Sequence, residues 1–302
     1  VMGAPVCVGI DPHLDRIPLT ILEKARKSYT NQRDIIVETV CGFCMPLLDV
    51  LIESGIRVVK PQVAFFEALG PNGLAAYEIV CQQAQELGML VIADVKRGDI
   101  GSTSAAYAAA WLGGTHIHGL RLRPFAVDAV TINPYFGTDG VDPFVKAAAE
   151  TSRGVFILLK TSNKTSAEFQ DLVLAGGEPV YTEVARKIEA WGSASTGERG
   201  YSDIGAVVGA NTPEIGAILR DILPNTLFLV PGFGAQGAGP DEIRPLFKAD
   251  GTGAIVNSSR GVIHAYGNDT YTGDWKALVA SAAKQFIADV RGALGRPAKA
   301  IR

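Results

Sequence analysis

Eight short apolar segments, each followed by a helical pattern, constrain the fold of this chain more than any other feature. They are rich in Val, Ile and Leu and are bounded by glycine or polar residues, as expected of buried strands. The segments span 6–11, 57–62, 89–95, 129–133, 155–160, 204–209, 227–232 and 253–259. Apolar strands joined by helices are typical of a parallel sheet covered by helices. We predict a single (β/α)8 TIM barrel domain over residues 1–302, with an open doubly wound sheet as the alternative.

Composition and charge exclude several functional classes. The 302 residues are 47% hydrophobic and 20% charged, so the core needs no disulfide or structural metal. The formal net charge of −3, without a block of like charges, argues against a nucleic-acid or anionic-membrane partner. No uninterrupted apolar run is long enough for a membrane span and no signal-peptide pattern is present, so we expect a cytoplasmic protein. Because the sequence starts at Val1-Met2 and enters a strand almost at once, we expect that a short leader is missing.

Cysteine and histidine positions do not favour a metal or redox centre. Cys41 and Cys44 form a C-x-x-C inside the long apolar helical pattern of 34–55, whereas a redox pair is expected at a strand-to-helix turn. Zinc would require two further ligands, so we interpret both cysteines as core residues. His116 and His118 form an H-x-H, but no histidine stands with acids at metal spacing, and we predict no metal.

Polar side chains gather at the C-terminal ends of the predicted strands, which is where the active sites of (β/α)8 barrels lie. The strand-end residues are Asp11 at the end of the first segment, Lys60 and Gln62 in the second, Asp94, Lys96 and Asp99 at the third, and Lys160, Thr161 and Ser162 at the fifth. Asp11 could instead cap a turn before Pro12, and Lys60 could form a salt bridge at the rim. Their positions favour contacts with substrate hydroxyls.

The densest signal is the decapeptide 94–103, in which two acids bracket a lysine. Residues two apart in a strand share a face, so Asp94 and Lys96 are expected on one side, with Asp99 beyond the turn. Two nearby carboxylates favour the charged form of the Lys96 amine. This argues against a Schiff-base aldolase and for a lysine that stabilises a developing carbanion and protonates it. A salt-bridged strand end is the structural alternative.

The glycine-rich segment 232–237 matches G-x-G-x-x-G but follows the seventh strand, whereas a dinucleotide fingerprint opens the first βαβ unit. Loops after strands seven and eight of a barrel commonly bind phosphate, and Arg260 follows the eighth strand here. We therefore predict a phosphate site, with a simple glycine turn as the alternative. The long connection from Ser162 to Pro179 suggests a mobile lid, although its distal half could be a disordered surface insertion.

Together these motifs resemble a known family. Asp94-x-Lys96-x-x-Asp99-Ile100-x-x-Thr103 occurs between an initial VGIDP and a later PGFGAQG and Ser-Arg-Gly, in the right order over nearly the whole chain. The sequence resembles orotidine 5′-phosphate decarboxylase, and CVGIDPH, KTSN, VVGA and NPYFG make it similar to the longer bacterial type. The resemblance implies loss of carbon dioxide from C6 of the orotate ring to give uridine monophosphate, without a metal or organic cofactor.

The resemblance also implies a role for each motif residue. Lys96 would protonate C6, Asp94 would lie beside the substrate carboxylate, and Asp99 would complete the charge network. The substrate-binding residues would be Asp11 and Lys60 at the ribose, Ser162 at the pyrimidine edge, Pro231 near the ring, and Gln236 and Arg260 at the phosphate. In the family the segment carrying Asp99, Ile100 and Thr103 serves the neighbouring subunit's site, which implies a homodimer.

Two rival functions remain at this stage. Keto-gulonate phosphate decarboxylases share the D-x-K-x-x-D run but use magnesium, held in part by an acid at the end of strand two. Here that position carries Lys60, which would repel the ion. The other rival is a catalytically silent nucleotide-monophosphate binder, against which the intact Asp94, Lys96 and Asp99 argue.

Overall fold

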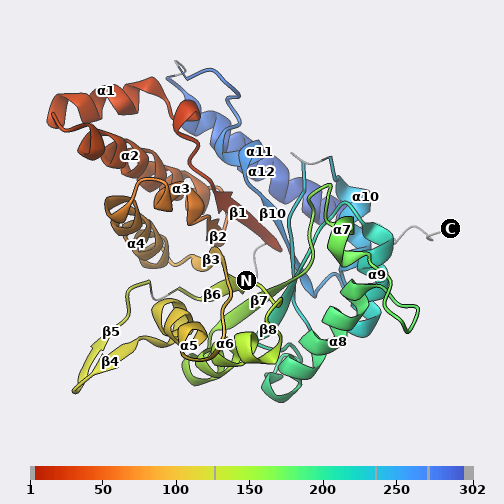
Figure 1. Ribbon diagram of the computed structural model, residues 1–302. Coiled ribbons are helices and arrows are strands. Elements are labelled where there is room, and N and C mark those ends of the chain that lie inside the picture. The colour runs from red at the N-terminus through yellow and green to blue at the C-terminus, as the bar shows by residue number, and fades with distance from the viewer. Residues whose placement is uncertain (1–3, 126, 235–236, 271–272, 296–302) are drawn as a thin grey trace. The chain divides into compact units, whose positions relative to one another are not determined.

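The computed structural model describes residues 4–295 apart from 126, 235–236 and 271–272 (Figure 1). Its main sheet is a closed barrel with the strand order β1-β10-β9-β8-β7-β6-β3-β2. The barrel strands are β1 (Val6–Ile10), β2 (Val58–Pro61), β3 (Leu90–Arg97), β6 (Ala129–Ile132), β7 (Gly154–Lys160), β8 (Ile204–Val208), β9 (Phe228–Val230) and β10 (Ala254–Ser258). Each of these strands overlaps one of the eight predicted segments, so the (β/α)8 prediction is confirmed.

Helices follow the barrel strands, as the helical patterns between the apolar segments predict. Their bounds are α1 (Leu19–Ser28), α2 (Gln32–Glu53), α3 (Ala64–Glu67), α4 (Pro71–Glu86), α5 (Gly101–Ala108), α6 (Thr138–Thr151), α7 (Ala167–Gln170), α8 (Val180–Gly192), α9 (Pro213–Ile222), α10 (Pro240–Ile243), α11 (Arg260–Ile263) and α12 (Trp275–Leu294). Proline opens α4, α9 and α10, where its fixed φ suits the first turn and its missing N–H is not needed.

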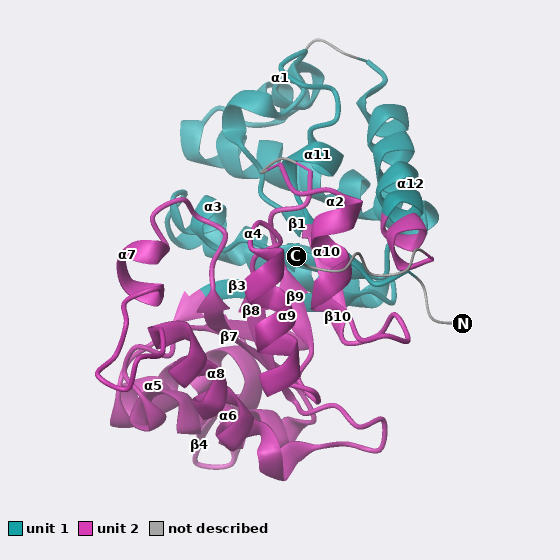
Figure 2. Cartoon of the chain, turned by 90° about the vertical axis from the view of Figure 1, so that its right-hand side faces the viewer, with its two compact units in different colours: residues 1–95, 258–289 teal, residues 96–257, 290–302 magenta. Residues whose placement is uncertain are grey.

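The chain divides into two compact units (Figure 2). Unit 1 comprises residues 1–95 and 258–289, and unit 2 comprises 96–257 and 290–302. The boundaries fall inside β3, at the end of β10 and inside α12, so regular elements run from one unit into the other.

The core of unit 1 is organised around α2, which packs against α1 and α4 (Figure 1). This helix is long and apolar enough to cross a membrane by length and composition. Val40, Phe43, Leu47 and Leu51 are fully buried on one face at helical spacing, which identifies α2 as a helix that packs within the unit.

The cysteine pair lies within this helix, as predicted. Cys44 is fully buried and Cys41 is half-buried. Burial, with Glu38 nearby, raises the pKa of the Cys41 thiol to about 11, and burial also raises the pKa of Cys44 above its ordinary value. Both thiols therefore stay protonated near neutral pH, which is unsuited to redox chemistry.

Unit 2 contains a β-hairpin that the sequence pattern does not predict. Strands β4 (Thr115–Ile117) and β5 (Leu120–Leu122) pair antiparallel around a two-residue turn. His118 and Gly119 both have positive φ, at 46° and 86°, as tight hairpin turns require. Ile117, Leu120 and Leu122 are exposed.

Candidate active site

A buried ion pair occupies the strand ends of unit 1. The Lys60 Nζ atom on β2 lies 2.5 Å from the Asp94 Oδ2 atom on β3, and both side chains are more than nine-tenths buried. Gln62 donates a second hydrogen bond to the same Asp94 oxygen, at 3.0 Å. The two strands pair in parallel at Val58–Leu90 and Val59–Val91, and a parallel bridge between Gln62 and Asp94 brings these side chains together.

The charge of Lys60 depends on this pair. Burial alone would favour the neutral amine, but the nearby carboxylates of Asp94 and Asp11 outweigh it and raise the pKa of Lys60 above its ordinary value. A fixed ammonium therefore lies at the end of strand two.

Asp11 directly follows β1 in unit 1, and one of its carboxylate oxygens is buried without a hydrogen bond to any residue that the structure describes. Its Oδ1 atom is buried and lacks a hydrogen-bond partner within the described part of the chain. A buried carboxylate oxygen without a donor is costly, so the site is suited to a ligand that brings one. The backbone carbonyl of Asp11 lies 3.3 Å from His264 Nε2, and His264 Nδ1 lies 2.9 Å from the Tyr266 hydroxyl. Tyr266 in turn donates to the Arg16 carbonyl, so these bonds tie the segment 11–16 after β1 to His264 and Tyr266.

Arg260 begins α11 immediately after β10 and its side chain is exposed. The preceding Ser259 packs closely on β1, because a Cβ on Gly9 would lie 1.9 Å from Ser259 Oγ. Gly9 thus allows the β10–α11 turn to approach β1, and this places Arg260 in the same unit as Asp11 and Lys60.

In unit 2, Lys96 is the penultimate residue of β3 and has an unusual backbone conformation. Its φ is 47°, in the left-handed region, which costs a non-glycine residue about 1–2 kcal/mol. The regular alternation of a strand is interrupted there, so alternation alone does not fix the direction of the exposed Lys96 side chain.

The segment after Lys96 presents the other residues of the motif to solvent. Asp99 is half-buried and its Oδ1 atom accepts a hydrogen bond from the Ile100 amide at 2.7 Å. Ile100 precedes α5 and is 55% exposed, and Thr103 is exposed in the first turn of α5. This exposure leaves Ile100 and Thr103 available to a second molecule.

Ser162 and Pro231 follow β7 and β9 and are linked through the end of β8. Asn211 Nδ2 donates to the Ser162 carbonyl at 3.2 Å, and the Ala210 amide donates to the Pro231 carbonyl at 3.0 Å. In the loop after β9, Gly232, Gly234 and Gly237 all have positive φ, which explains the glycine spacing. Gln236, predicted at the phosphate, lies outside the described residues.

The connection after β7 is tied to the strand that precedes it. Lys160, fully buried, contacts Asp171 Oδ1 at 2.5 Å and Ser166 Oγ at 3.4 Å. Gln170 accepts from the Thr161 amide at 3.0 Å and donates to its hydroxyl at 2.8 Å. The connection was predicted as a mobile lid, with a disordered insertion as the alternative for its distal half. It contains the short helix α7, and its distal half contains a bridge between Val173 and Pro179.

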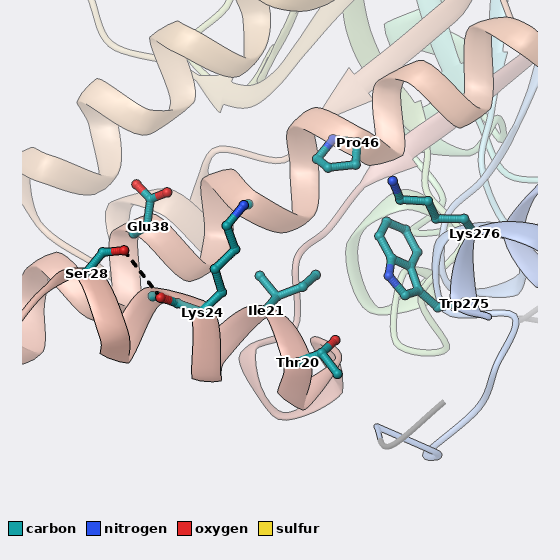
Figure 3. A pocket seen from close by; sticks show the side chains of 10 residues that line it. Thr20, Ile21, Lys24, Ser28, Glu38, Pro46, Trp275 and Lys276 are labelled. Atoms are coloured by element: carbon teal, nitrogen blue, oxygen red, sulfur yellow. Dashed lines mark hydrogen bonds between the residues drawn. The ribbon is translucent and has the colours of Figure 1, made fainter. Parts of the chain in front are cut away.

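A separate cavity of about 260 Å³ lies among α1, α2 and the start of α12 in unit 1 (Figure 3). Trp275 and Ile21 line it, and Lys24 and Lys276 carry its positive charge. Among the residues that the structure describes, none of those predicted for the site lines this cavity. Across the described residues, His, Cys, Asp and Glu side chains nowhere gather in threes that could hold a metal ion.

Two partners in the site were not foreseen from the sequence. The sequence places Gln62 at a strand end, but its hydrogen bond to Asp94 depends on the register of β2 against β3. His264 stands alone in the sequence, and no local pattern indicates that it holds Asp11, which lies at the other end of the chain.

A closed parallel barrel with helices between its strands defines the (β/α)8 class of enzymes, and the buried Lys60–Asp94 pair lies towards the strand ends, where active sites of this fold are found. Residues 5–272 match the model of the Orotidine 5'-phosphate decarboxylase / HUMPS family. The chain belongs to this family, as its motifs predict.

Individual relatives agree over most of the chain. An orotidine 5'-phosphate decarboxylase of Rhodopirellula baltica is 36% identical over 96% of this chain and 95% of its own length. One from Caldicellulosiruptor bescii is 38% identical over 86% of this chain and 85% of its own. The solved structure of Leishmania donovani OMP decarboxylase superposes with a TM-score of 0.70 at 28% identity, covering 97% of this chain and 95% of that one.

Proposed function

We propose that this chain decarboxylates orotidine 5′-phosphate to uridine 5′-phosphate in de novo pyrimidine biosynthesis, without a metal or organic cofactor. Family membership and the names of the relatives support this reaction. The observation that carries it is the buried Lys60–Asp94 pair, at 2.5 Å. A fixed ammonium at the end of strand two would repel the magnesium ion on which the keto-gulonate phosphate decarboxylases depend.

The reaction requires one bond to break and one to form at C6. The bond from C6 to the carboxylate carbon breaks, carbon dioxide leaves, and the electron pair stays on C6. The Lys96 ammonium stabilises this developing negative charge and then donates a proton to C6, after which the neutral amine takes a proton from water. Asp94 lies beside the substrate carboxylate and disfavours its charge, while Asp99 completes the charge network around the lysine of the neighbouring subunit's site.

Binding is assigned to the remaining predicted residues. Asp11 and Lys60 contact the ribose hydroxyls, and the unsatisfied Oδ1 atom of Asp11 supports this role because a hydroxyl would supply its missing donor. Ser162 meets the pyrimidine edge, Pro231 borders the ring, and Gln236 and Arg260 bind the phosphate. Phosphate binding remote from C6 can supply energy for excluding water from the reacting carbon.

The proposed enzyme is a cytoplasmic homodimer with no nucleic-acid or membrane partner. Asp99, Ile100 and Thr103 serve the neighbouring subunit's site. The exposure of Ile100 and Thr103 supports this arrangement, and the net charge of −3 supports the absence of a polyanionic partner.

The test is the loss of ultraviolet absorbance when orotidine 5′-phosphate is mixed with the protein in excess EDTA. We expect wild-type turnover in EDTA and a loss of about 10³-fold or more in Lys96→Ala. Binding of the nucleotide without turnover would replace the enzyme with a nucleotide sensor. Turnover that EDTA abolishes would contradict the metal-free mechanism.

A further inference from the structure

Lys96 has a left-handed backbone conformation, and the proposed mechanism gives this conformation no part. Among the described residues, three that are not glycine have positive φ, namely Lys96, His118 and Ser152. His118 lies in a hairpin turn and Ser152 caps the end of α6, where left-handed residues are common. Lys96 lies at the end of a barrel strand instead, so neighbouring groups must hold its conformation.

Two such groups come from the strand β6 and the residue after it. The Lys96 amide donates to the Thr131 Oγ1 atom at 3.0 Å, and the Arg97 carbonyl accepts from the Asn133 amide at 2.8 Å. In the first bond the acceptor of the Lys96 N–H is a side-chain hydroxyl of the neighbouring segment.

Thr131 is well placed to act as a fixed support. It is 1% exposed and lies within β6, and it is in register with Phe156 of β7. A β-branched side chain in a strand has restricted χ1, so its hydroxyl keeps its position. Removing the hydroxyl would delete the hydrogen bond between Thr131 and the Lys96 N–H.

We propose that Thr131 is a positioning residue for the reaction, because its hydroxyl holds Lys96 in the left-handed conformation from which the ammonium acts. The catalytic consequence rests on the proposed function, whereas the support of the Lys96 backbone does not. A lysine that relaxes towards an extended backbone would carry its side chain in another direction. Small misplacements of a reacting group slow the reaction strongly.

The experiment compares Thr131→Val, which keeps the shape but removes the hydroxyl, with Thr131→Ser, which keeps the hydroxyl. Thr39→Val is the matched control, because Thr39 is also buried but its hydroxyl bonds to the Ile35 carbonyl within α2. Each protein is assayed for kcat and KM with orotidine 5′-phosphate, and hydrogen exchange at the Lys96 amide is measured by mass spectrometry with peptide fragmentation.

We expect Thr131→Val to lose about 100-fold in kcat with little change in KM, and its Lys96 amide to exchange about tenfold faster or more. Thr131→Ser should recover most of both values, and Thr39→Val should match the wild type. A Thr131→Val protein with wild-type kcat and exchange would overturn the proposal, and so would a Thr131→Ser protein as impaired as Thr131→Val. If the wild type does not decarboxylate the nucleotide, the proposed function fails, and the exchange rates still decide whether Thr131 holds Lys96.

Discussion

Lys60 and Asp94 show how strongly two residues can depend on each other. Each is a charge buried in unit 1, and the carboxylate of Asp94 is the largest influence that keeps Lys60 charged. Burying two ions costs several kcal/mol, which their attraction and hydrogen bonds offset only while both are present.

We therefore expect Lys60→Met to lower the free energy of unfolding by about 3 kcal/mol, because Asp94 then stays buried without its ammonium. The double variant Lys60→Met/Asp94→Asn should lose less than the sum of the two single variants. Urea denaturation measures all three. Lys146→Met, which removes an exposed i,i+4 pair with Asp142, is the control and should leave stability almost unchanged. Strict additivity of the two buried changes would contradict the coupling.

His264 predicts a pH dependence of stability. Burial lowers its pKa to about 4, while the ordinary value is 6.5, so the unfolded chain binds a proton that the folded chain refuses between these values. Stability should fall as the pH drops from about 6.5 towards 4, by up to about 3 kcal/mol from this residue. Urea midpoints measured across this range should show a shallower slope for His264→Gln. Equal slopes in the two proteins would exclude His264 as the source.

At the scale of elements, the strands followed from the sequence and the hairpin did not. The barrel strands are buried on both faces, so they can be recognised in the sequence as continuous apolar runs. The β4–β5 hairpin has only three residues a strand and turns at His118-Gly119, without the Asn-Gly or Asp-Gly pair that signals such turns. In the site, the motif residues were predictable because they follow strand ends, whereas the bonds to Gln62, Thr131 and His264 depend on which strands become neighbours.

The connection after β7 gives a prediction for one element. Asp171 is the carboxylate partner of the buried Lys160, so Asp171→Asn should loosen residues 163–179. We expect limited proteolysis within this segment to accelerate by about tenfold, which is the effect of losing one hydrogen bond to a charged group. Ser166→Ala, which removes a contact of 3.4 Å, should have a smaller effect. Unchanged cleavage in Asp171→Asn would show that Lys160 does not restrain the connection.

For the whole molecule, the proposed dimer can be tested on the exposed Ile100. Ile100→Asp should weaken dimerisation by about 30-fold or more and reduce decarboxylation in parallel, because a charge would be buried where an apolar side chain belongs. Analytical ultracentrifugation at several concentrations measures the first effect. Ile79→Asp is the matched control, since Ile79 on α4 is 50% exposed. A fully dimeric Ile100→Asp protein would remove this residue from the interface.

We also propose that residues 1–302 form one domain, although their contacts define two units. Neither unit contains all eight barrel strands, and β3, β10 and α12 each contribute residues to both. Calorimetry should therefore show one unfolding transition with equal calorimetric and van't Hoff enthalpies. Two resolved transitions would indicate that the units fold independently.

The left-handed backbone at Lys96 also bears on how this sequence can change over generations. Glycine adopts that conformation without steric penalty, so replacing Lys96 by glycine removes strain at the same time as it removes the ammonium. Loss of the reaction at this position would then carry no folding defect for quality control to detect. Inactive lineages would accumulate as abundant, well-folded proteins, and only selection for the reaction itself would keep a lysine there.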